Sequence, residues 1–389
     1  MKKKQVQTLV LVVSIAIACV GLGAKILNSF LPSPVQALFF GISILGVAFI
    51  LSWAAEAAQL DMSRGLAIAL LALIAVLPEY AVDLYFSWTA AFDPSYTHFA
   101  TANMTGANRL LVGLALPLIV ILYWIKTKKT IFKINPEHRV ELSYLFIATL
   151  YSFVIVLKGS LSLIDTIVLF IIFALYMKRV SRTHQEKPYL VGPAELIGSF
   201  SKNKRRITVI LLFLFSAGVI LFVTEPFAEA LIESGSHLGV DEFLLVQWLS
   251  PLASEAPEFI IAIIYVTRNL TRVGFETLIS SKINQWTLLV GSIPLVYSIA
   301  LGGPSILVFD DRQVHEMLLT GAQSLLLIFV MINLRMSWKG AVSLITLFFA
   351  QFFIPDIRLE ISIIYLILVG LLLVRHRNDV KPLFRGLYS

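Results

Sequence analysis

The sequence contains very little cysteine, histidine or charge. Cys19 is the only cysteine among 389 residues, so the chain can form neither an internal disulfide nor a cysteine-based metal cluster. The six histidines lie in predicted loops or near predicted helix ends. No H-E-x-x-H motif occurs, which argues against a zinc-dependent enzyme. Charged residues make up 14% of the chain, whereas a soluble domain carries about 25%, so this composition cannot cover a water-facing surface.

Long apolar segments fill most of the chain. Hydrophobic residues make up 58% of it, and the mean hydropathy is +0.85. Apolar runs of roughly 17–25 residues recur from end to end, and each is long enough to cross the hydrocarbon layer as a helix. We therefore expect an all-α polytopic membrane protein with about 12 transmembrane helices. The predicted helices lie near 7–27, 35–55, 63–91, 98–125, 140–157, 160–177, 207–232, 242–267, 273–300, 314–333, 338–354 and 359–375.

The formal net charge of +7 comes from basic residues that cluster in alternate loops. The N-terminus, the loops 126–139 and 178–206, and the segment after 375 are all rich in lysine and arginine. With twelve helices these segments fall on one face, which the positive-inside rule identifies as cytoplasmic. We predict that both termini are cytoplasmic, in an inner or plasma membrane. The basic loops should contact anionic lipid rather than nucleic acid.

Two Pro-Glu pairs lie within apolar sequence, one in each half of the chain. Pro78-Glu79 occurs in LALIAVLPEYAVDL (71–84), and Pro257-Glu258 occurs in LSPLASEAPEFIIA (249–262), so the numbering offset is 257 − 78 = 179. Acidic residues inside membrane spans are costly and by default indicate function. In the twelve-helix topology these two spans run in opposite directions, which predicts two inverted repeats that share one site near the bilayer midplane.

Further similarity between the halves defines the expected organisation. LLVGLALP (110–117) resembles LLVGSIP (288–294), and each follows a Pro-Glu pair in the same order. We expect an extra N-terminal transmembrane helix over 1–30, a first repeat over 31–177, a cytoplasmic connector over 178–206, a second repeat over 207–354, and a C-terminal transmembrane helix with a basic tail over 355–389.

Polar residues follow each Pro-Glu pair at a matching distance. Steps of four and three along the chain place each set on one face of a helix. Such sets often only hold membrane helices together, so helix packing and ligand binding both remain possible interpretations. At a numbering offset of 277 − 101 = 176, Thr101, Thr105 and Asn108 in the first half correspond to Thr277, Ser281 and Asn284 in the second.

The residues around the two prolines could supply an oxygen-only site. Each proline removes a backbone donor, so we expect breaks at Pro78 and Pro257 whose freed carbonyls line a cavity. Neighbouring carboxylates share helix faces with these breaks. Oxygen ligands suit calcium, magnesium, manganese or sodium and argue against zinc or copper. The predicted cation ligands are Glu79, Asp83, Ser254, Glu255, Glu258, Thr105, Asn108, Ser281 and Asn284.

Two basic residues also fall within predicted spans. Arg109 follows Asn108 directly, and Lys282 precedes Asn284 by two positions. An uncompensated charge there would be costly, so each could neutralise one carboxylate and stabilise the packing. Alternatively, a basic group could occupy the place of one bound cation and reduce the number of coupling ions.

At these residues the chain resembles the calcium/cation antiporter superfamily, which contains sodium/calcium and proton/calcium exchangers. That superfamily has two inverted five-helix repeats, each with a signature like G-T-S-x-P-E on one helix and G-N-x-x-G-S-N on the next. The first signature is matched here at Pro78-Glu79 and more fully at Ser254-Glu255-Ala256-Pro257-Glu258. The second is matched by Ala102-Asn103-Met104-Thr105-Gly106-Ala107-Asn108, whereas little of it remains at 280–286.

The resemblance implies specific roles. Glu79 and Glu258 correspond to the two central acidic cation ligands of the superfamily, and Ser254 to a hydroxyl ligand. Asn108 and Asn284 correspond to flanking amide ligands. Ala75 and Val76 stand where the superfamily has hydroxyls, which implies an incomplete sodium site.

Residues and resemblance together predict a secondary active antiporter that exchanges calcium or a related cation for sodium or protons. Sodium/proton or other monovalent exchange is the alternative, favoured by the missing hydroxyls and by Lys282. An intramembrane enzyme is a remote third hypothesis. We expect inorganic cations and the lipid bilayer as partners, with no nucleic acid, no cofactor and no enzymatic activity.

Overall fold

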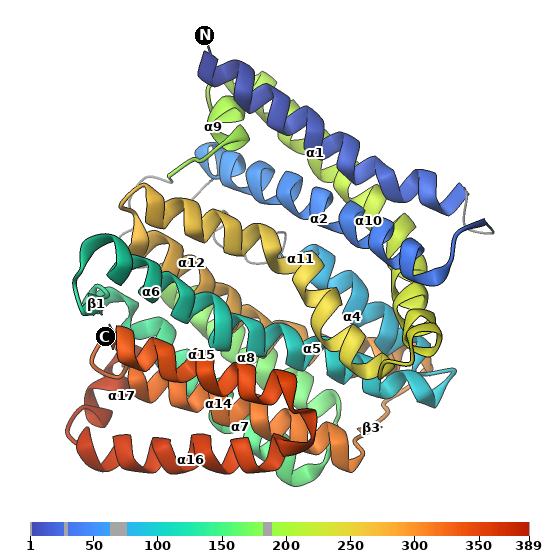
Figure 1. The fold of residues 1–389 in the computed structure, drawn as a ribbon. Helices are drawn as coiled ribbons and strands as arrows, with labels where there is room; N and C mark the ends of the chain where they lie inside the picture. The colour runs from blue at the N-terminus through green and yellow to red at the C-terminus, as the bar shows by residue number, and fades with distance from the viewer. Residues whose placement is uncertain (1, 27–29, 63–75, 182–188, 389) are drawn as a thin grey trace. The chain divides into compact units, whose positions relative to one another are not determined.

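A computed structural model describes residues 2–26, 30–62, 76–181 and 189–388 (Figure 1). The described chain is almost entirely helical, and eight of its helices are long and apolar enough to cross a membrane. The first half contains α1 (Lys2–Ile26), α2 (Ser33–Ala58), α4 (Leu77–Thr89), α5 (Thr97–Leu110), α6 (Leu116–Thr127), α7 (Arg139–Lys158) and α8 (Leu163–Val180). The second half contains α9 (Pro193–Gly198), α10 (Lys202–Leu238), α11 (Glu242–Thr267), α12 (Thr271–Asn284), α13 (Val290–Ala300), α14 (Asp311–Val330), α15 (Trp338–Phe353), α16 (Arg358–Arg375) and α17 (Val380–Tyr388).

Each predicted helix corresponds to helical structure in the described residues, which confirms the all-α polytopic fold. The part of the predicted helix 63–91 that falls on residues 63–75 lies outside them. α10 has 37 residues and a length of about 55 Å, so it is longer than the ~30 Å hydrocarbon layer and extends beyond the predicted 207–232. The short helices α9 and α17 were not predicted, because neither is an apolar run.

The two halves repeat one unusual local structure. α5 and α12 each have 14 residues, and each is followed directly by a five-residue π-helix and then by another α-helix. The π-helices are Leu111–Ala115 and Gln285–Leu289. Single π-turns inside helices are rare and often occur at functional sites. Their recurrence at a numbering offset of 285 − 111 = 174 supports the internal repeat.

Four short strands, which the helical pattern did not predict, form two ladders, each with one strand from either half of the chain. β1 (Ile131–Lys133) pairs with β4 (Arg335–Ser337), and β2 (Ser160–Leu161) pairs with β3 (Leu307–Val308), both antiparallel. β1 precedes the 20-residue helix α7 and β2 follows it, so the two ladders lie at opposite ends of a helix about 30 Å long. In each ladder one strand comes from each half of the chain, as expected for inverted repeats.

The chain divides into two compact units that do not coincide with the repeats. Unit 1 comprises residues 1–86 and 181–258, and unit 2 comprises residues 87–180 and 259–389. In unit 1, α2 packs against both α1 and α10 (Figure 1). Gly46 allows the close approach of α1, because a Cβ there would lie 2.7 Å from the backbone nitrogen of Ala18.

α14 is the central helix of unit 2. It packs against α5, α7 and α16, and most of its residues are buried. A capping box begins it, because the Asp310 side chain accepts a bond from the backbone of Gln313 and the Gln313 side chain accepts one from the backbone of Asp310. In the same unit, α17 packs on α7 with Phe384 against Phe146.

Candidate functional site

The predicted acidic ligands lie on two helices, and all of them belong to unit 1. In α4, Glu79 is 1% exposed and Asp83 is fully buried. In α11, Glu255 is 3% exposed, whereas Glu258 is partly buried. The two Pro-Glu acids, which come from opposite halves of the sequence, therefore belong to the same compact unit.

The structure tests only the helix break predicted at Pro257, because residues 63–75, which precede Pro78, lie outside the described residues. α11 runs without interruption through Pro251 and Pro257, so the break at Pro257 was wrongly predicted. Ser254 lies between these two prolines, and its hydroxyl donates to the carbonyls of Ser250 and Pro251 at 3.3 and 3.2 Å. Pro78 is the second residue of α4, a position where proline is well tolerated.

Ser254 and Asp83 have surroundings that the sequence did not define. The Ser254 hydroxyl donates within its own helix and keeps lone pairs that can still accept or ligate. Asp83 is fully buried. Half a turn further along α4, Tyr85 donates to Glu229 of α10 at 2.6 Å. Sequence reasoning missed Glu229, because no motif surrounds it.

In unit 2, the structure brings two of the predicted residues into direct contact. The Lys282 ammonium of α12 donates to the Asn108 amide oxygen of α5 at 2.6 Å, and it lies 4.2 Å from the centre of the Trp286 ring. The Asn108 amide nitrogen donates to the Met104 carbonyl at 2.8 Å. Both the Lys282 and the Asn108 side chains are fully buried. A protein ammonium thus already contacts the amide oxygen that was predicted to bind a cation.

The helix ends show that these two residues are counterparts in the repeats. α5 and α12 align from end to end at a numbering offset of 271 − 97 = 174, which pairs Asn108 with Lys282. The offset of 176, which the sequence predicted from similar residue types and which paired Asn108 with Asn284, does not fit these helix ends. Asn284 is the last residue of α12, and it is buried.

The remaining hydroxyl ligands have different surroundings in the two repeats. Thr105 donates to the Thr101 carbonyl at 2.7 Å, and the Thr101 hydroxyl accepts a bond from Gln313 of α14 at 2.8 Å. These bonds agree with the helix-packing interpretation of the first set. In the second set, the Ser281 hydroxyl oxygen is buried and makes no hydrogen bond within the described residues. Thr277, by contrast, is exposed.

Arg109 neutralises a carboxylate that was not among the predicted ligands. Its guanidinium lies 2.5 Å from Glu316 of α14 and donates to Gln351 of α15 at 3.3 Å. Arg358 of α16 pairs with the other oxygen of Glu316. Glu316 is fully buried, and it could have been found as an acid inside the apolar segment 314–333.

Asn103 is another candidate that was missed, although it is part of the second signature. It is fully buried in α5, and neither atom of its amide has a hydrogen-bond partner within the described residues. Buried polar groups are normally satisfied by protein, water or a ligand. Asn103 is therefore a candidate ligand of the same kind as Asn108.

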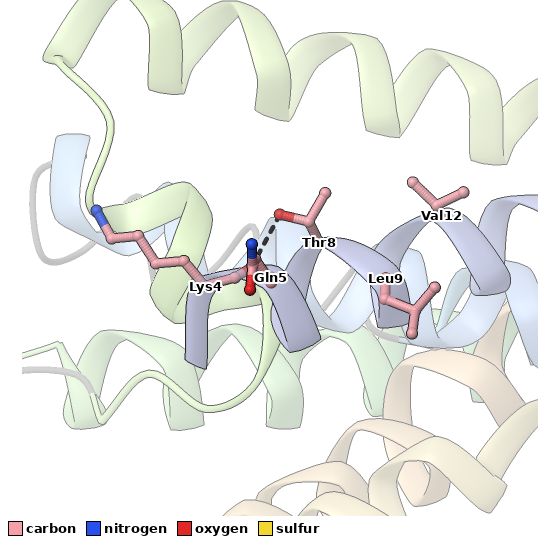
Figure 2. A pocket seen from close by; sticks show the side chains of 5 residues that line it. All are labelled: Lys4, Gln5, Thr8, Leu9 and Val12. Carbon is pink, nitrogen blue, oxygen red and sulfur yellow. Dashed lines mark hydrogen bonds between the residues drawn. The ribbon is translucent and has the colours of Figure 1, made fainter. Parts of the chain in front are cut away.

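Within the described residues, the predicted ligands form no cluster typical of a metal site, and they do not line the hollow on α1. Within the described ranges, no group of three or more His, Cys, Asp or Glu side chains is arranged to hold a metal ion. Figure 2 shows a hollow on α1 at which Thr8 donates to the Lys4 carbonyl at 2.9 Å. The hollow is lined by Lys4, Gln5, Thr8, Leu9 and Val12.

Comparison with known proteins identifies the family. The family model described as sodium/calcium exchanger protein matches residues 9–180 and 208–355. The chain belongs to this family. A crystal structure of an H⁺/Ca²⁺ exchanger, CAX, is 40% identical to this exchanger-family chain, covers 98% of each chain and superposes with a TM-score of 0.92.

More distant relatives of this exchanger-family chain share its fold. Native YfkE is 14% identical, covers 91% of this chain and 99% of its own, and has a TM-score of 0.64. The sodium-calcium exchanger NCX_Mj is 18% identical, covers 82% and 97%, and has a TM-score of 0.54. No curated protein sequence matches significantly. These similarities establish inverted repeats as the architecture of the chain.

Proposed function

We propose that this protein is a secondary active antiporter that exchanges Ca²⁺ for H⁺ or Na⁺ across a membrane. The observation that carries the proposal is the burial of acids from both repeats, Glu79 and Glu255, with Asp83 and Glu258 on the same two helices. Buried carboxylates without enzymatic motifs serve ion pathways and proton relays in membrane proteins. The 40% identity to an H⁺/Ca²⁺ exchanger over 98% of both chains supports the same assignment.

Glu79 and Glu258 are the acids that we propose to bind the transported cation. A divalent ion is stabilised by two carboxylates, and its departure leaves like charges in a medium of low dielectric constant. Repulsion and desolvation then favour protonation of the carboxylates. Competition of Ca²⁺ and protons for the same acids couples the two fluxes without a separate device. Asp83, Glu255 and Ser254 are proposed as supporting oxygen ligands on the same two helices.

Protons are the favoured coupling ion. Val76, which stands where the superfamily carries a hydroxyl, is buried and apolar, so it offers no oxygen to a sodium ion. A proton needs only the carboxylate itself. Exchange of monovalent cations is the second candidate, because the buried Lys282 ammonium already places one positive charge beside Asn108. A fixed positive charge at Asn108 opposes the binding of a further cation to that amide oxygen.

The proposed location is an inner or plasma membrane with both termini in the cytoplasm. The basic loops and the basic ends of the chain support this orientation. Inorganic cations and lipid are the proposed partners, and no cofactor or enzymatic step is part of the proposal.

The test is uptake of labelled Ca²⁺ into proteoliposomes under an imposed proton or sodium gradient. Uptake should follow the proton gradient in wild type and should fall at least severalfold in Glu79→Gln and in Glu258→Gln. Glu233→Gln is the matched control, because Glu233 of α10 is exposed, and it should transport as wild type does. Uptake that depends on neither gradient would contradict the antiport assignment. Full activity in both glutamine variants would contradict the proposed cation site.

A further inference from the structure

Three titratable residues meet at the β1–β4 end of unit 2. His138 is the residue before α7, Glu141 lies in the first turn of α7, and Glu276 lies in the second turn of α12. The two ring nitrogens of His138 face the two carboxylates, with Nδ1 at 3.3 Å from Glu141 and Nε2 at 2.7 Å from Glu276. Only a protonated imidazole can donate to both. His138 thus links α7 to α12 through two charged hydrogen bonds.

The inverted repeat shows what occupies the same positions at the other end. α7 and α14 both have 20 residues and align at a numbering offset of 311 − 139 = 172. This offset pairs His138 with Asp310, and Glu141 with Gln313. At the β2–β3 end, Gln313 donates to the Thr97 carbonyl at 3.1 Å and to the Thr101 hydroxyl at 2.8 Å. α14 is therefore linked to the start of α5 just as α7 is linked to the start of α12.

The two links differ in their chemistry. The link to α5 uses an amide, a hydroxyl and a backbone carbonyl, none of which titrates. The link to α12 uses an imidazolium and two carboxylates. Other charged groups near it are Arg139, which adjoins His138, and Arg272, which donates to Asn135 at 2.9 Å. Tyr176 of α8 completes the surroundings, with its hydroxyl 2.9 Å from Ser280.

Burial raises the energetic cost of leaving any charge in this link uncompensated. Glu141 is 8% exposed, and its second carboxylate oxygen has no hydrogen-bond partner within the described residues. Its charge is therefore balanced at this end chiefly by His138. Burial by itself would lower the pKa of His138, but the two carboxylates that bond the ring outweigh it and raise the pKa to about 10. Loss of the proton would leave two carboxylates facing a neutral ring, of which only one could still receive a hydrogen bond.

We propose that His138 is a positioning residue that holds the beginning of α12 on α7 through Glu276 and Glu141, at one end of the membrane only. α12 carries Lys282, Ser281 and Asn284, so release of its first turns alters the placement of groups proposed to act in cation exchange. The opposite end, where Gln313 makes the equivalent link, does not respond to the same change of charge. This proposal concerns the conformation of unit 2, and only its consequence for transport rests on the proposed function.

The test measures a distance within unit 2. In a Cys19→Ala background, Thr277→Cys on α12 and Leu150→Cys on α7 provide two exposed sites for spin labels. We expect one narrow distance distribution in the parent protein and a second population in His138→Gln and in Glu276→Gln. His138→Arg keeps the charge and should restore the narrow distribution. Gln313→Ala is the matched control at the other end and should leave this distance unchanged.

A pH series covers the case in which a neutral variant does not fold. The parent protein should gain the second population above about pH 10, whereas His138→Arg should keep the narrow distribution there. An unchanged distribution in His138→Gln, or equal behaviour of the parent and His138→Arg at high pH, would overturn the proposal. Because the readout is a distance, a failure of the antiport assignment would appear separately, as absent Ca²⁺ exchange in a protein with an intact link.

Discussion

The Lys282 ammonium donates to the amide oxygen of Asn108 at 2.6 Å, and the two residues occupy equivalent positions in α12 and α5. An inverted repeat usually places similar groups at equivalent positions. Here one repeat supplies an amide and the other supplies a positive charge that bonds to it. This asymmetry gives the protein a fixed internal cation, which distinguishes its second repeat from its first.

Lys282→Met tests the role of this fixed charge. The substitution removes a positive charge and leaves the Asn108 oxygen without its donor, so we expect tighter cation binding together with a loss of about 1–3 kcal/mol in the free energy of unfolding. Titration calorimetry with Ca²⁺ and Na⁺ measures the first effect. Lys339→Met is the control, since Lys339 is exposed and lies 5.9 Å from the Trp338 ring. Equal affinities in wild type and Lys282→Met would show that the ammonium does not act on the cation.

Glu316→Gln tests the buried ion-pair cluster. Without the carboxylate, Arg109 is left as a buried charge beside Arg358. Removing one partner of a buried ion pair typically costs about 3–5 kcal/mol, so the variant should unfold at a clearly lower temperature in detergent. Glu195→Gln, which breaks the exposed pair with Lys3, should change stability by less than about 1 kcal/mol. A Glu316→Gln protein as stable as Glu195→Gln would contradict this assignment.

Gly46→Ala tests the close packing of α1 on α2. The added Cβ would lie 2.7 Å from the Ala18 nitrogen and 3.0 Å from the Ser14 carbonyl oxygen, both of them backbone atoms. Such overpacking costs about 1–3 kcal/mol. Gly218→Ala in α10 is the matched control, because nothing lies within 4 Å of its Cβ position. That control should be neutral or stabilising by up to about 1 kcal/mol, since alanine favours the helix. Thermal unfolding of both variants checks the difference.

Stability should depend on pH through His138. Against the opposing effect of burial, Glu141 and Glu276 raise its pKa to about 10 in the folded protein, compared with about 6.5 when unfolded. The folded state therefore binds the proton more tightly. The stabilisation is complete below about pH 6.5, declines as the pH rises and is lost above about pH 10. The difference in unfolding temperature between wild type and His138→Gln should shrink over this range. A difference that is constant from about pH 6 to about pH 10 would show that His138 is not held in its charged form in the folded protein.

Residue patterns were sufficient for the helices, because each membrane span must satisfy its own backbone bonds and must be apolar over a fixed length. α11 was predicted at its observed bounds for this reason. The four strands could not be predicted. They are two or three residues long and exist only because loops from both repeats meet at each end of α7.

The site was predictable only where residue type alone limits the possibilities. An acid inside an apolar span needs compensation wherever it lies, so Glu79 and Asp83 could be chosen, and both are buried. The hydrogen-bond and ion-pair partners of such residues could not be predicted in this way. Whether Arg109 would bond to a ligand carboxylate or to Glu316, which lies in the other half of the chain, depends on which helix packs on α5.

By itself, the sequence determined that this chain is a duplicated bundle of membrane helices with acids at equivalent places, because hydrophobic length and the cost of buried charge act locally. Only the tertiary structure decided that Lys282 faces Asn108, that Glu316 holds two arginines and that His138 links α7 to α12. Each of these contacts depends on how separate helices pack, and many packings would satisfy the same local pattern.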